Sequence, residues 1–431
     1  MNVCVKTARL GTPCWANSTC QAIEVTASTD TPSQGPLRGV RILDLATVVA
    51  APLAGTLCAD MGAEVIKVEL PQGGDALRSL APVWQGHELF WKVANRGKQG
   101  ITLDVRQAQG RNLLLRMLPQ FDVLIENFRT GTMDAWGLDI ATLHAHNPNL
   151  IVLRLTGFGQ TGPYAKRPGF ARVFEAMSGF THLTGEADGP PQHMNYPLGD
   201  AIAGLFGAFS ISTALAERAR TSPAQYKGCE IDLAATEALF RLLDPLAAEM
   251  QFMDMVRQRS GSRATYTAPS NVFETADGQW ITIVGTGNPI FERICKAMDR
   301  TDLLTDPRFT NNLERTRHLV ELDQEIATWC GKHPIAHVML QLDAQEAPYS
   351  RVNSIAQAAQ DPHFMARKAL IDLPDSDLGS VKAPCIVPRF VGKELPTPHT
   401  GPHRGEHNEN FYAAINLSES ELALLKANKV I

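Results

Sequence analysis

The sequence lacks the paired cysteines that mark redox and disulfide-stabilised proteins. Its eight cysteines are scattered over 431 residues and form no Cys-x-x-Cys pair. In a chain of this length, such a distribution is typical of reduced thiols. We therefore expect a cytoplasmic protein.

The sequence also lacks an apolar run long enough for a membrane span and an excess of charge of either sign. The longest apolar run is Ala201–Ala216, 16 residues interrupted by Gly204 and Gly207, whereas a span needs roughly 20. A buried helix is the better interpretation. The net charge of −5 predicts neither a nucleic-acid partner nor binding to an anionic membrane surface.

The nucleophile motif of serine hydrolases is absent, and the dinucleotide-binding motif is incomplete. There is no Gly-x-Ser-x-Gly, so a serine hydrolase of the α/β type would lack its nucleophile elbow. The segment 157–162, GFGQTG, fits Gly-x-Gly-x-x-Gly, but Pro163 and Pro168 follow it where a dinucleotide-binding loop would open a helix. We expect a glycine loop and no redox cofactor.

The histidines do not form a convincing metal site. His333 and His337 have the i, i+4 spacing of two ligands on one helical face, but no third ligand is evident. His399, His403 and His407 lie in a proline-rich tail, where even spacing fixes no geometry. We expect solvent-facing histidines and no bound metal.

What is present is a regular alternation of short apolar runs and helical segments from residue 39 to about 160, typical of an α/β domain with a parallel sheet. The predicted strands are 39–46, 63–70, 99–105, 122–128 and 149–159, and the predicted helices are 51–62, 107–121, 172–185, a helix from Asp200, and a long helical stretch over 229–256.

The pattern changes near residue 265. Val272–Thr275 and Trp280–Val284 flank Asp277-Gly278, which predicts a β-hairpin. A short helix after a capping serine, Ser418, is predicted near the C-terminus. We predict a disordered extension (1–36), a large Rossmann-like domain (37–235), a helical linker (236–264), a small α+β domain (265–345), and a linker with a return to the large domain (346–431).

One carboxylate, Asp200, stands between Gly199 and the long apolar run. Aspartate is a favoured N-cap residue, so capping is one interpretation. The other is a covalent nucleophile, because a helix N-terminus favours the ionised carboxylate and carboxylates form acyl intermediates. The local sequence leaves both open.

Several segments together resemble the class III CoA-transferase family (CaiB/BaiF type), which includes formyl-CoA:oxalate and carnitine CoA-transferases and 2-methylacyl-CoA racemases. They occur in family order from Leu37 to the C-terminal region. Among them are GVRILDLATVVAAPLAG, MGAEVIKVELPQGGDALR, ANRGKQGITLDVR, VLIENFRTGTMDAWGL, NPNLIVLRLTGFGQTGPY, LGDAIAGLFG, VFETADGQWITI and VNSIAQAAQDPHF.

The resemblance implies a function and a set of site residues. Asp200 matches the family nucleophile, which moves CoA from an acyl-CoA to a free carboxylic acid through an aspartyl anhydride and an aspartyl-CoA thioester. CoA is then substrate and product. The implied CoA contacts are Val49, Ala50, Leu103, Asp104, Val105, Arg106, Asn127, Phe128 and Arg129. The resemblance also implies an interlaced homodimer of Rossmann-like large domains and small domains.

The chain departs from parts of the family pattern. Oxalate-type members have glutamine at the position of Val49 and arginine at those of Leu70 and Ala135, so we expect a more apolar acyl pocket. The glycine run that precedes the small-domain hairpin in that type is absent here.

Racemases have a His-Asp pair where this chain has Phe170 and Ala171, and phenylalanine is neither acid nor base. A racemase or isomerase is therefore the disfavoured alternative. A non-catalytic CoA-binding homologue stays open.

Overall fold

The computed structural model describes residues 34–431, so most of the predicted extension 1–36 lies outside the described residues. A six-stranded parallel sheet in the order β5-β2-β1-β6-β7-β8 forms the centre of the large domain. Its strands are β1 (Arg41–Asp44), β2 (Glu64–Glu69), β5 (Gln99–Thr102), β6 (Val123–Glu126), β7 (Ile151–Thr156) and β8 (Glu230–Ala234). This is the Rossmann order, in which successive crossovers change direction between β1 and β6.

Helices cover both faces of this sheet because its strands alternate apolar side chains between two cores. In β1, Leu43 packs with one core and Ile42 with the other. The Leu43 core lies against α3 (Ala108–Met117), α5 (Ile140–His146), α17 (Asn408–Ala414) and α18 (Glu419–Ala427). The Ile42 core lies against α1 (Ala50–Asp60), α8 (Leu198–Arg220) and α9 (Ala235–Phe240).

The long helix predicted over 229–256 is wrong. The segment begins with β8, which extends the sheet by parallel pairing with β7, from Val152↔Glu230 to Thr156↔Ala234. It continues as α9 and, after Pro245, as α10 (Leu246–Met253). The first residues of the segment are therefore a strand because they pair with the open edge of β7, although their composition also suits a helix.

The small domain contains the β-hairpin that the sequence predicts. Strands β9 (Ser270–Glu274) and β10 (Trp280–Val284) pair antiparallel around Gly278, whose φ is +68°, and β11 (Tyr349–Arg351) adds a third strand. Its core packs this sheet against helices. They are α11 (Asn288–Ala297), α12 (Asn312–Arg317), α13 (Leu319–Cys330) and α14 (Ile335–Ala344), with a 3₁₀ turn at Thr301–Leu304.

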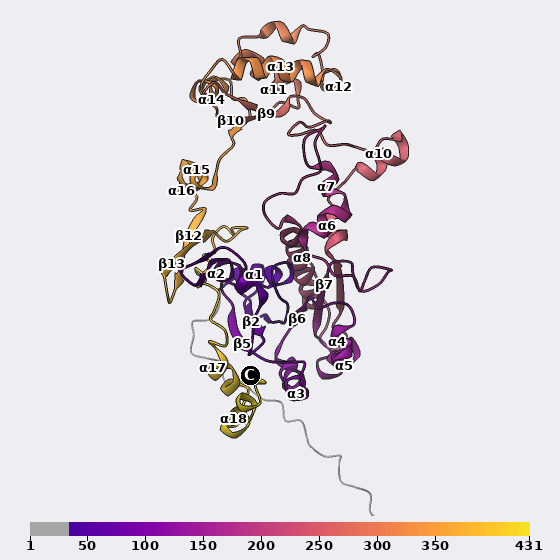
Figure 1. Cartoon of the computed structure of the whole chain (residues 1–431), viewed down its shortest axis with the longest axis vertical. Coiled ribbons are helices and arrows are strands. Elements are labelled where there is room, and N and C mark those ends of the chain that lie inside the picture. Colours follow the sequence, from indigo (N-terminus) through magenta and orange to yellow (C-terminus); the bar gives the residue numbers. More distant parts are fainter. Residues whose placement is uncertain (1–33) are drawn as a thin grey trace, which may run out of the picture.

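Figure 1 shows the small domain at one end of an elongated molecule and the six-stranded sheet toward the other, joined by two separate segments. The outgoing segment runs from α9 to β9 and contains α10. α6 (Ala171–Ser178) and α7 (Phe180–Leu183) come before α8 in the chain, and α7 lies beside α10. The returning segment contains α15 (Ile355–Gln360), α16 (Pro362–Ala366) and the hairpin β12–β13 (Leu370–Asp375, Gly379–Pro384). The shorter elements are β3 (Val83–Trp84), β4 (His87–Glu88), α2 (Leu89–Ala94), α4 (Thr132–Ala135) and 3₁₀ turns at Ala76–Ser79 and Leu118–Gln120.

Helix α8 contains the long apolar run and packs against α1 and the sheet. Within residues 34–431 it is the one helix long and apolar enough, by length and composition alone, to cross a membrane. Gly204 and Gly207 bring its backbone close to α1, since a Cβ on Gly204 would lie 2.6 Å from the Ala50 carbonyl oxygen. One face of α8 is buried against α1 and the sheet, while Leu205 and Phe209 are exposed, so the prediction of a buried helix holds for one face alone. This packing fixes the start of α8 beside the start of α1.

Candidate active site

Two neighbouring cavities lie at the carboxyl ends of the parallel strands, where β1 and β6 mark the reversal of strand order. Open α/β sheets bind their ligands at this position. The first, here called the Asp200 cavity, has about 220 Å³ and is lined by Thr47, Val48, Val49, Ala50, Asn127, Phe128, Arg129, Leu155, Thr156, Gly157, Ala165, Arg167, Pro168, Gly169, Phe170, Phe174 and Asp200.

The second cavity, of about 380 Å³, opens beside the ends of β2 and β5. Its lining residues are Leu45, Thr47, Val68, Glu69, Leu70, Gly74, Asp75, Leu103, Val105, Arg106, Phe128, Arg129, Thr132 and Trp136. Thr47, Phe128 and Arg129 line both cavities. The two together therefore offer adjoining spaces for a long ligand that reaches Asp200 at one end.

The structure distributes the sequence-predicted site residues over these cavities. Asp200 shares its cavity with Val49, Ala50 and the segment 127–129. Leu103, Val105 and Arg106 line the second cavity, and Asp104 lines neither. Their roles as CoA contacts stay predictions.

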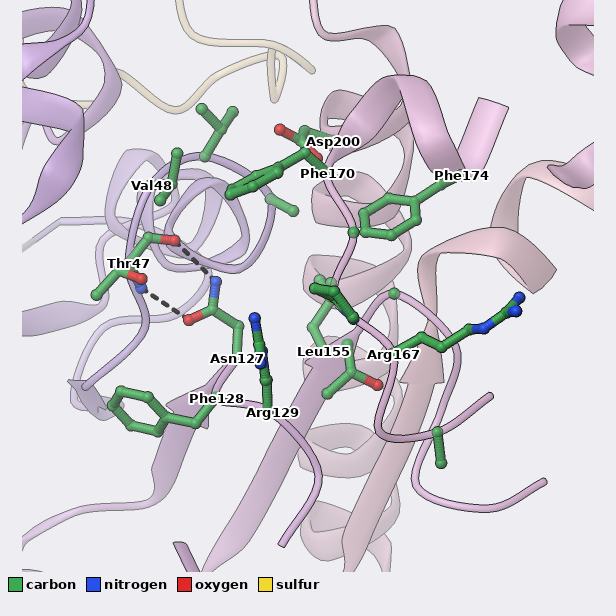
Figure 2. Close-up of a pocket in the computed structure, with 17 residues that line it drawn as sticks. Thr47, Val48, Asn127, Phe128, Arg129, Leu155, Arg167, Phe170, Phe174 and Asp200 are labelled. Carbon is green, nitrogen blue, oxygen red and sulfur yellow. Dashed lines mark hydrogen bonds between the residues drawn. The ribbon is translucent and has the colours of Figure 1, made fainter. Parts of the chain in front are cut away.

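Asp200 lies in the first turn of α8 and does not cap it. The helix begins at Leu198, its N-cap residue is Pro197, and the cap makes no side-chain hydrogen bond. The capping interpretation is therefore wrong. Among the described residues the Asp200 carboxylate has no hydrogen bond or ion pair. Figure 2 shows it across the cavity from Asn127 and Arg129, with Phe170 beside it.

The surroundings of Asp200 make its carboxyl group a weaker acid than usual. Only 9% of the residue is exposed. Burial, with a smaller contribution from the nearby carboxylate of Glu175, raises the pKa of Asp200 to about 6. The ionised form is thus available at neutral pH with little solvation, which suits a nucleophile.

This burial has a cost in stability that can be measured. A pKa of about 6 against about 3.9 in an unfolded chain means that folding disfavours the carboxylate, so stability is lost as pH rises from 4 to 6. We expect Asp200→Asn to stabilise the protein by about 3 kcal/mol at pH 8 and by roughly half as much at pH 5. Denaturant unfolding at the two pH values measures this.

The matched control for that stability experiment is Asp306→Asn. Hydrogen bonds from Arg308 lower the pKa of Asp306 to about 2, so neutralising this partly buried carboxylate removes a favourable interaction. It should not stabilise the protein at pH 8. Equal effects of both substitutions would contradict the burial cost assigned to Asp200.

The wall opposite Asp200 is held by Asn127. Its Oδ1 accepts a hydrogen bond of 2.8 Å from the Thr47 amide, and its Nδ2 donates one of 2.8 Å to the Thr47 carbonyl oxygen (Figure 2). The amide group is thereby engaged on both sides. Asn127 joins the loop after β1 to the loop after β6, while Phe128 and Arg129 face the cavities.

The loop after β1 adopts a strained backbone at the cavity wall. Val48 has φ of +68°, a conformation rare for β-branched residues and found at sites where surroundings enforce it. The Asp75 carboxylate accepts hydrogen bonds from the amides of Val48 (3.0 Å) and Leu77 (2.9 Å). Val48 and Asp75 are not predicted from the sequence, because nothing in the pair Val48-Val49 indicates a left-handed backbone.

A buried ionic network lies under this loop. The Lys67 ammonium is 3.1 Å from Asp75 and contacts the Ala46 carbonyl oxygen. The Lys98 ammonium donates to Asp44 at 2.8 Å. All four charged side chains are almost fully buried. Burial lowers the pKa of Lys67, but Asp44 and Asp75 outweigh it and hold that pKa above its usual range. Burial also lowers the pKa of Lys98, and Asp44 offsets this only in part. These paired groups lie beneath the site and hold the loop from below.

Arg106 is held in place by its neighbour. Its guanidinium makes two hydrogen bonds to Asp104, of 2.8 and 2.9 Å, and these bonds hold the pKa of the Asp104 carboxyl below its usual range. The Asp104 amide donates to the Val430 carbonyl oxygen near the C-terminus. Asp104 is therefore placed to orient Arg106.

The departures from the family pattern fall in different places. Val49 lines the Asp200 cavity, and Leu70 lines the second cavity. Ala135 is exposed on α4 and lines neither. Of these three residues, Val49 is the one that lines the Asp200 cavity, together with Arg129 and Arg167. The expectation of a more apolar acyl pocket stays a prediction.

The glycine loop at 157–162 and the pair of His333 and His337 do not form the sites that their spacing could suggest. Gly157 follows β7, and the next helix, α6, begins only at Ala171, so no helix opens on the glycine loop. A Cβ on Gly157 would lie 2.3 Å from the ring of Phe174, so glycine is needed for this packing. His333 and His337 stack at 4.3 Å, and residues 34–431 contain no group of three or more metal-ligating side chains.

The fold and site define a Rossmann-like α/β protein with a buried carboxylate, unpaired among the described residues, in the crevice at the strand ends. The family model of CoA-transferase family III matches residues 37–408, and the chain belongs to that family. It is a class III CoA-transferase.

Its relatives include the succinyl-CoA–D-citramalate CoA-transferase of Chloroflexus aurantiacus, 39% identical over 92% of this chain and 98% of that protein. The succinate–glutarate CoA-transferase of Agrobacterium fabrum is 34% identical over 88% of this chain and 96% of that protein. The crystal structure of a CaiB/BaiF family protein from Brucella suis is similar, with a TM-score of 0.77 and 31% identity over 89% of this chain and all of the other.

Proposed function

We propose that this protein transfers CoA from an acyl-CoA to a free carboxylic acid through covalent intermediates on Asp200. The observation that carries the proposal is the Asp200 carboxylate, which has no hydrogen-bond partner within residues 34–431 and lines the same crevice as Arg129 and the loop after β1. A buried carboxylate with no other role, placed where open α/β sheets bind ligands, suits nucleophilic catalysis.

The proposed reaction has four exchanges. An Asp200 oxygen attacks the thioester carbonyl, the C–S bond breaks, and CoA leaves as a thiolate with a mixed anhydride on Asp200. The thiolate attacks the Asp200 carbonyl carbon and releases the donor acid as a carboxylate. The acceptor carboxylate attacks the resulting aspartyl-CoA thioester and again frees the thiolate. Attack of this thiolate on the acceptor carbonyl forms the new acyl-CoA and restores Asp200.

We propose succinyl-CoA as donor and a dicarboxylic acid as acceptor. The names of the similar proteins pair succinyl-CoA with D-citramalate and succinate with glutarate. The lining of the Asp200 cavity includes two arginines, Arg129 and Arg167, among apolar walls. The Arg167 guanidinium lies over the Tyr164 ring and points away from Asp200, so Arg129 is the cation that faces the cavity (Figure 2). A guanidinium is the side chain best suited to bind a second carboxylate.

The racemase alternative is disfavoured by the lining of the same cavity. Racemisation requires an acid and a base on opposite faces of the α-carbon. The lining residues include one carboxylate, Asp200, and no histidine, while Phe170 projects into the cavity wall. Incubation in deuterated water separates the two functions, because a racemase would exchange the α-proton of its acyl-CoA.

We further propose that the protein works as an interlaced homodimer in the cytoplasm. The segments that join the two domains expose large apolar side chains, among them Phe240, Met250, Phe252 and Met253, and such patches are typical of protein interfaces. Light scattering should give twice the mass of one chain. The free thiols of the described cysteines are compatible with a reducing compartment.

The experiment that tests the transferase is an exchange assay. The purified protein is incubated with succinyl-CoA and a panel of acids comprising D-citramalate, L-malate, glutarate and oxalate, and new CoA esters are identified by mass. We expect CoA esters of one or more dicarboxylates. Hydroxylamine added during turnover should leave a hydroxamate on Asp200. Absence of any new CoA ester across a wide panel of acyl-CoA donors would contradict the proposal.

Arg129 provides a prediction about binding. Because it lines both cavities, we expect Arg129→Ala to remove a charge-assisted contact to CoA and to raise KM for the acyl-CoA by about 10–100-fold. Steady-state kinetics measure this. Arg116→Ala is the control, since this arginine lies on α3 in an exposed pair with Glu421. Equal KM values for both variants would contradict a role for Arg129 in binding.

A further inference from the structure

A second buried carboxylate, Glu175, lies next to the nucleophile without lining its cavity. Only 4% of this residue is exposed. Its two oxygens have different partners: Oε1 accepts a 2.9 Å hydrogen bond from the Gly199 amide, and Oε2 lies 2.9 Å from Nδ1 of His193. Glu175 on α6 therefore connects the first turn of α8 to the segment 184–197.

The start of α8 needs such a partner. The first amides of a helix have no acceptor within the helix, and a capping side chain normally supplies one. Pro197 at the N-cap supplies none. Glu175 provides the acceptor from a neighbouring helix, at the residue directly before Asp200.

The backbone at Gly199 is shaped for this contact. A Cβ there would lie 3.0 Å from the Ala171 carbonyl oxygen and 3.3 Å from Oε1 of Glu175. Glycine therefore allows α6 to approach the start of α8 at hydrogen-bond distance. The approach would be tight for any other residue.

His193 holds the outer oxygen of Glu175. Its side chain is 26% exposed, and Nδ1 is also 3.4 Å from the Thr181 hydroxyl at the start of α7. The imidazole thus restrains the Glu175 carboxylate from the solvent side, while Gly199 restrains it from the inside.

From these contacts we infer that Glu175, held by His193, is a positioning residue that fixes the first turn of α8 and so aims the Asp200 carboxylate at the thioester. The inference rests on the proposed role of Asp200. A misplacement of about 1 Å in a reacting group can reduce a rate by roughly 100-fold.

The contact between Glu175 and the Gly199 amide also brings the carboxylates of Glu175 and Asp200 near each other. Glu175 is the charged group whose field acts on Asp200 from the packed element α6. His193 faces Glu175 from the segment 184–197, and Arg129 and Arg167 are among the residues that line the cavity of Asp200. Glu175 therefore positions Asp200 and also weakens its acidity, and the two effects can be separated by substitution.

The test uses Glu175→Gln and Glu175→Ala in the full-length protein. Glutamine keeps an oxygen for the Gly199 amide and offers an N–H to His193, but it removes the charge. We expect its kcat above pH 7 to stay within about 3-fold of the parent, and the acid limb of its kcat/KM profile to move to lower pH. Alanine removes the hydrogen bonds and should lower kcat by about 10–100-fold while KM for acyl-CoA changes little.

The controls address folding and the parent mechanism. Arg172→Ala changes an exposed residue of the same helix and should leave kcat unchanged. His193→Ala should lower kcat by less than Glu175→Ala, and it tests the coupling if Glu175→Ala does not fold. Thermal melts and light scattering check each variant.

The outcomes distinguish the inference from the proposed function. An active Asp200→Asn variant would overturn the nucleophile itself. An inactive Asp200→Asn variant together with full kcat in Glu175→Ala would overturn the positioning role. Equal losses of kcat in the glutamine and alanine variants would overturn it as well. An unmoved acid limb in Glu175→Gln would overturn the effect of the Glu175 charge on the pKa of Asp200.

Discussion

Asp200→Asn and Asp200→Ala should lower the rate of CoA exchange by at least about 1,000-fold, the scale of loss seen when a covalent nucleophile is removed. Asparagine keeps the shape of the side chain, and the parent carboxylate has no hydrogen bond to lose among the described residues. The loss would therefore report chemistry. The measurement is the appearance of a new CoA ester, resolved by liquid chromatography.

The same experiment has an internal check in its pH profile. Because burial first and Glu175 second raise the pKa of Asp200 to about 6, kcat/KM of the parent should fall about tenfold per pH unit below pH 6. Binding of acyl-CoA to Asp200→Asn should persist, since the cations of the crevice are untouched. Undiminished exchange by the variant would exclude Asp200 as nucleophile.

Gly204→Val is expected to have the second-largest effect, on both stability and rate. A Cβ at position 204 would lie 2.6 Å from the Ala50 carbonyl oxygen and 2.9 Å from Cβ of Leu53. Neither the carbonyl oxygen of Ala50 nor the Cβ of Leu53 can rotate away, so α1 and α8 must separate. We expect a loss of at least about 2 kcal/mol in stability and a fall in kcat, because α8 positions Asp200 and α1 follows the Val48 loop.

The control for this prediction is Ala216→Val, a β-branched substitution at an exposed position of the same helix. It carries the cost of helix propensity alone, which is below about 1 kcal/mol. Urea unfolding and steady-state kinetics on both variants measure the difference. Similar stability and kcat in the two variants would show that the close approach of α1 and α8 is not needed.

Local sequence patterns predicted much of the fold. The alternating segments before residue 160 gave the strands β1, β2, β5, β6 and β7 because buried parallel strands are continuous apolar runs. Asp277-Gly278 predicted the β9–β10 hairpin, since few residue types adopt the backbone conformation of a two-residue hairpin turn. Ser418 caps α18 with a capping box that includes Glu421.

The errors lie where long-range pairing decides. The residues of β8, EIDLA, alternate polar and apolar side chains but run directly into a helical pattern, so the sequence favours one continuous helix. In the structure they form a strand that pairs with β7. Asp200 has the residue type of a cap, yet α8 starts two residues earlier, at Leu198. Its environment depends on Glu175, which is 25 positions away in the chain.

By itself, the sequence determined the α/β class, the crevice loops and the identity of the carboxylate, because these depend on residue types in local patterns and on a recognisable order of segments. Only the tertiary structure decided that this carboxylate is buried, has no partner in the part of the chain that the structure describes, and has a pKa of about 6. It also decided that Val48 is held in a left-handed backbone by Asp75. The physical reason is that solvation, close contacts and electrostatic fields depend on distances between residues far apart in the chain, and only the packed fold sets those distances.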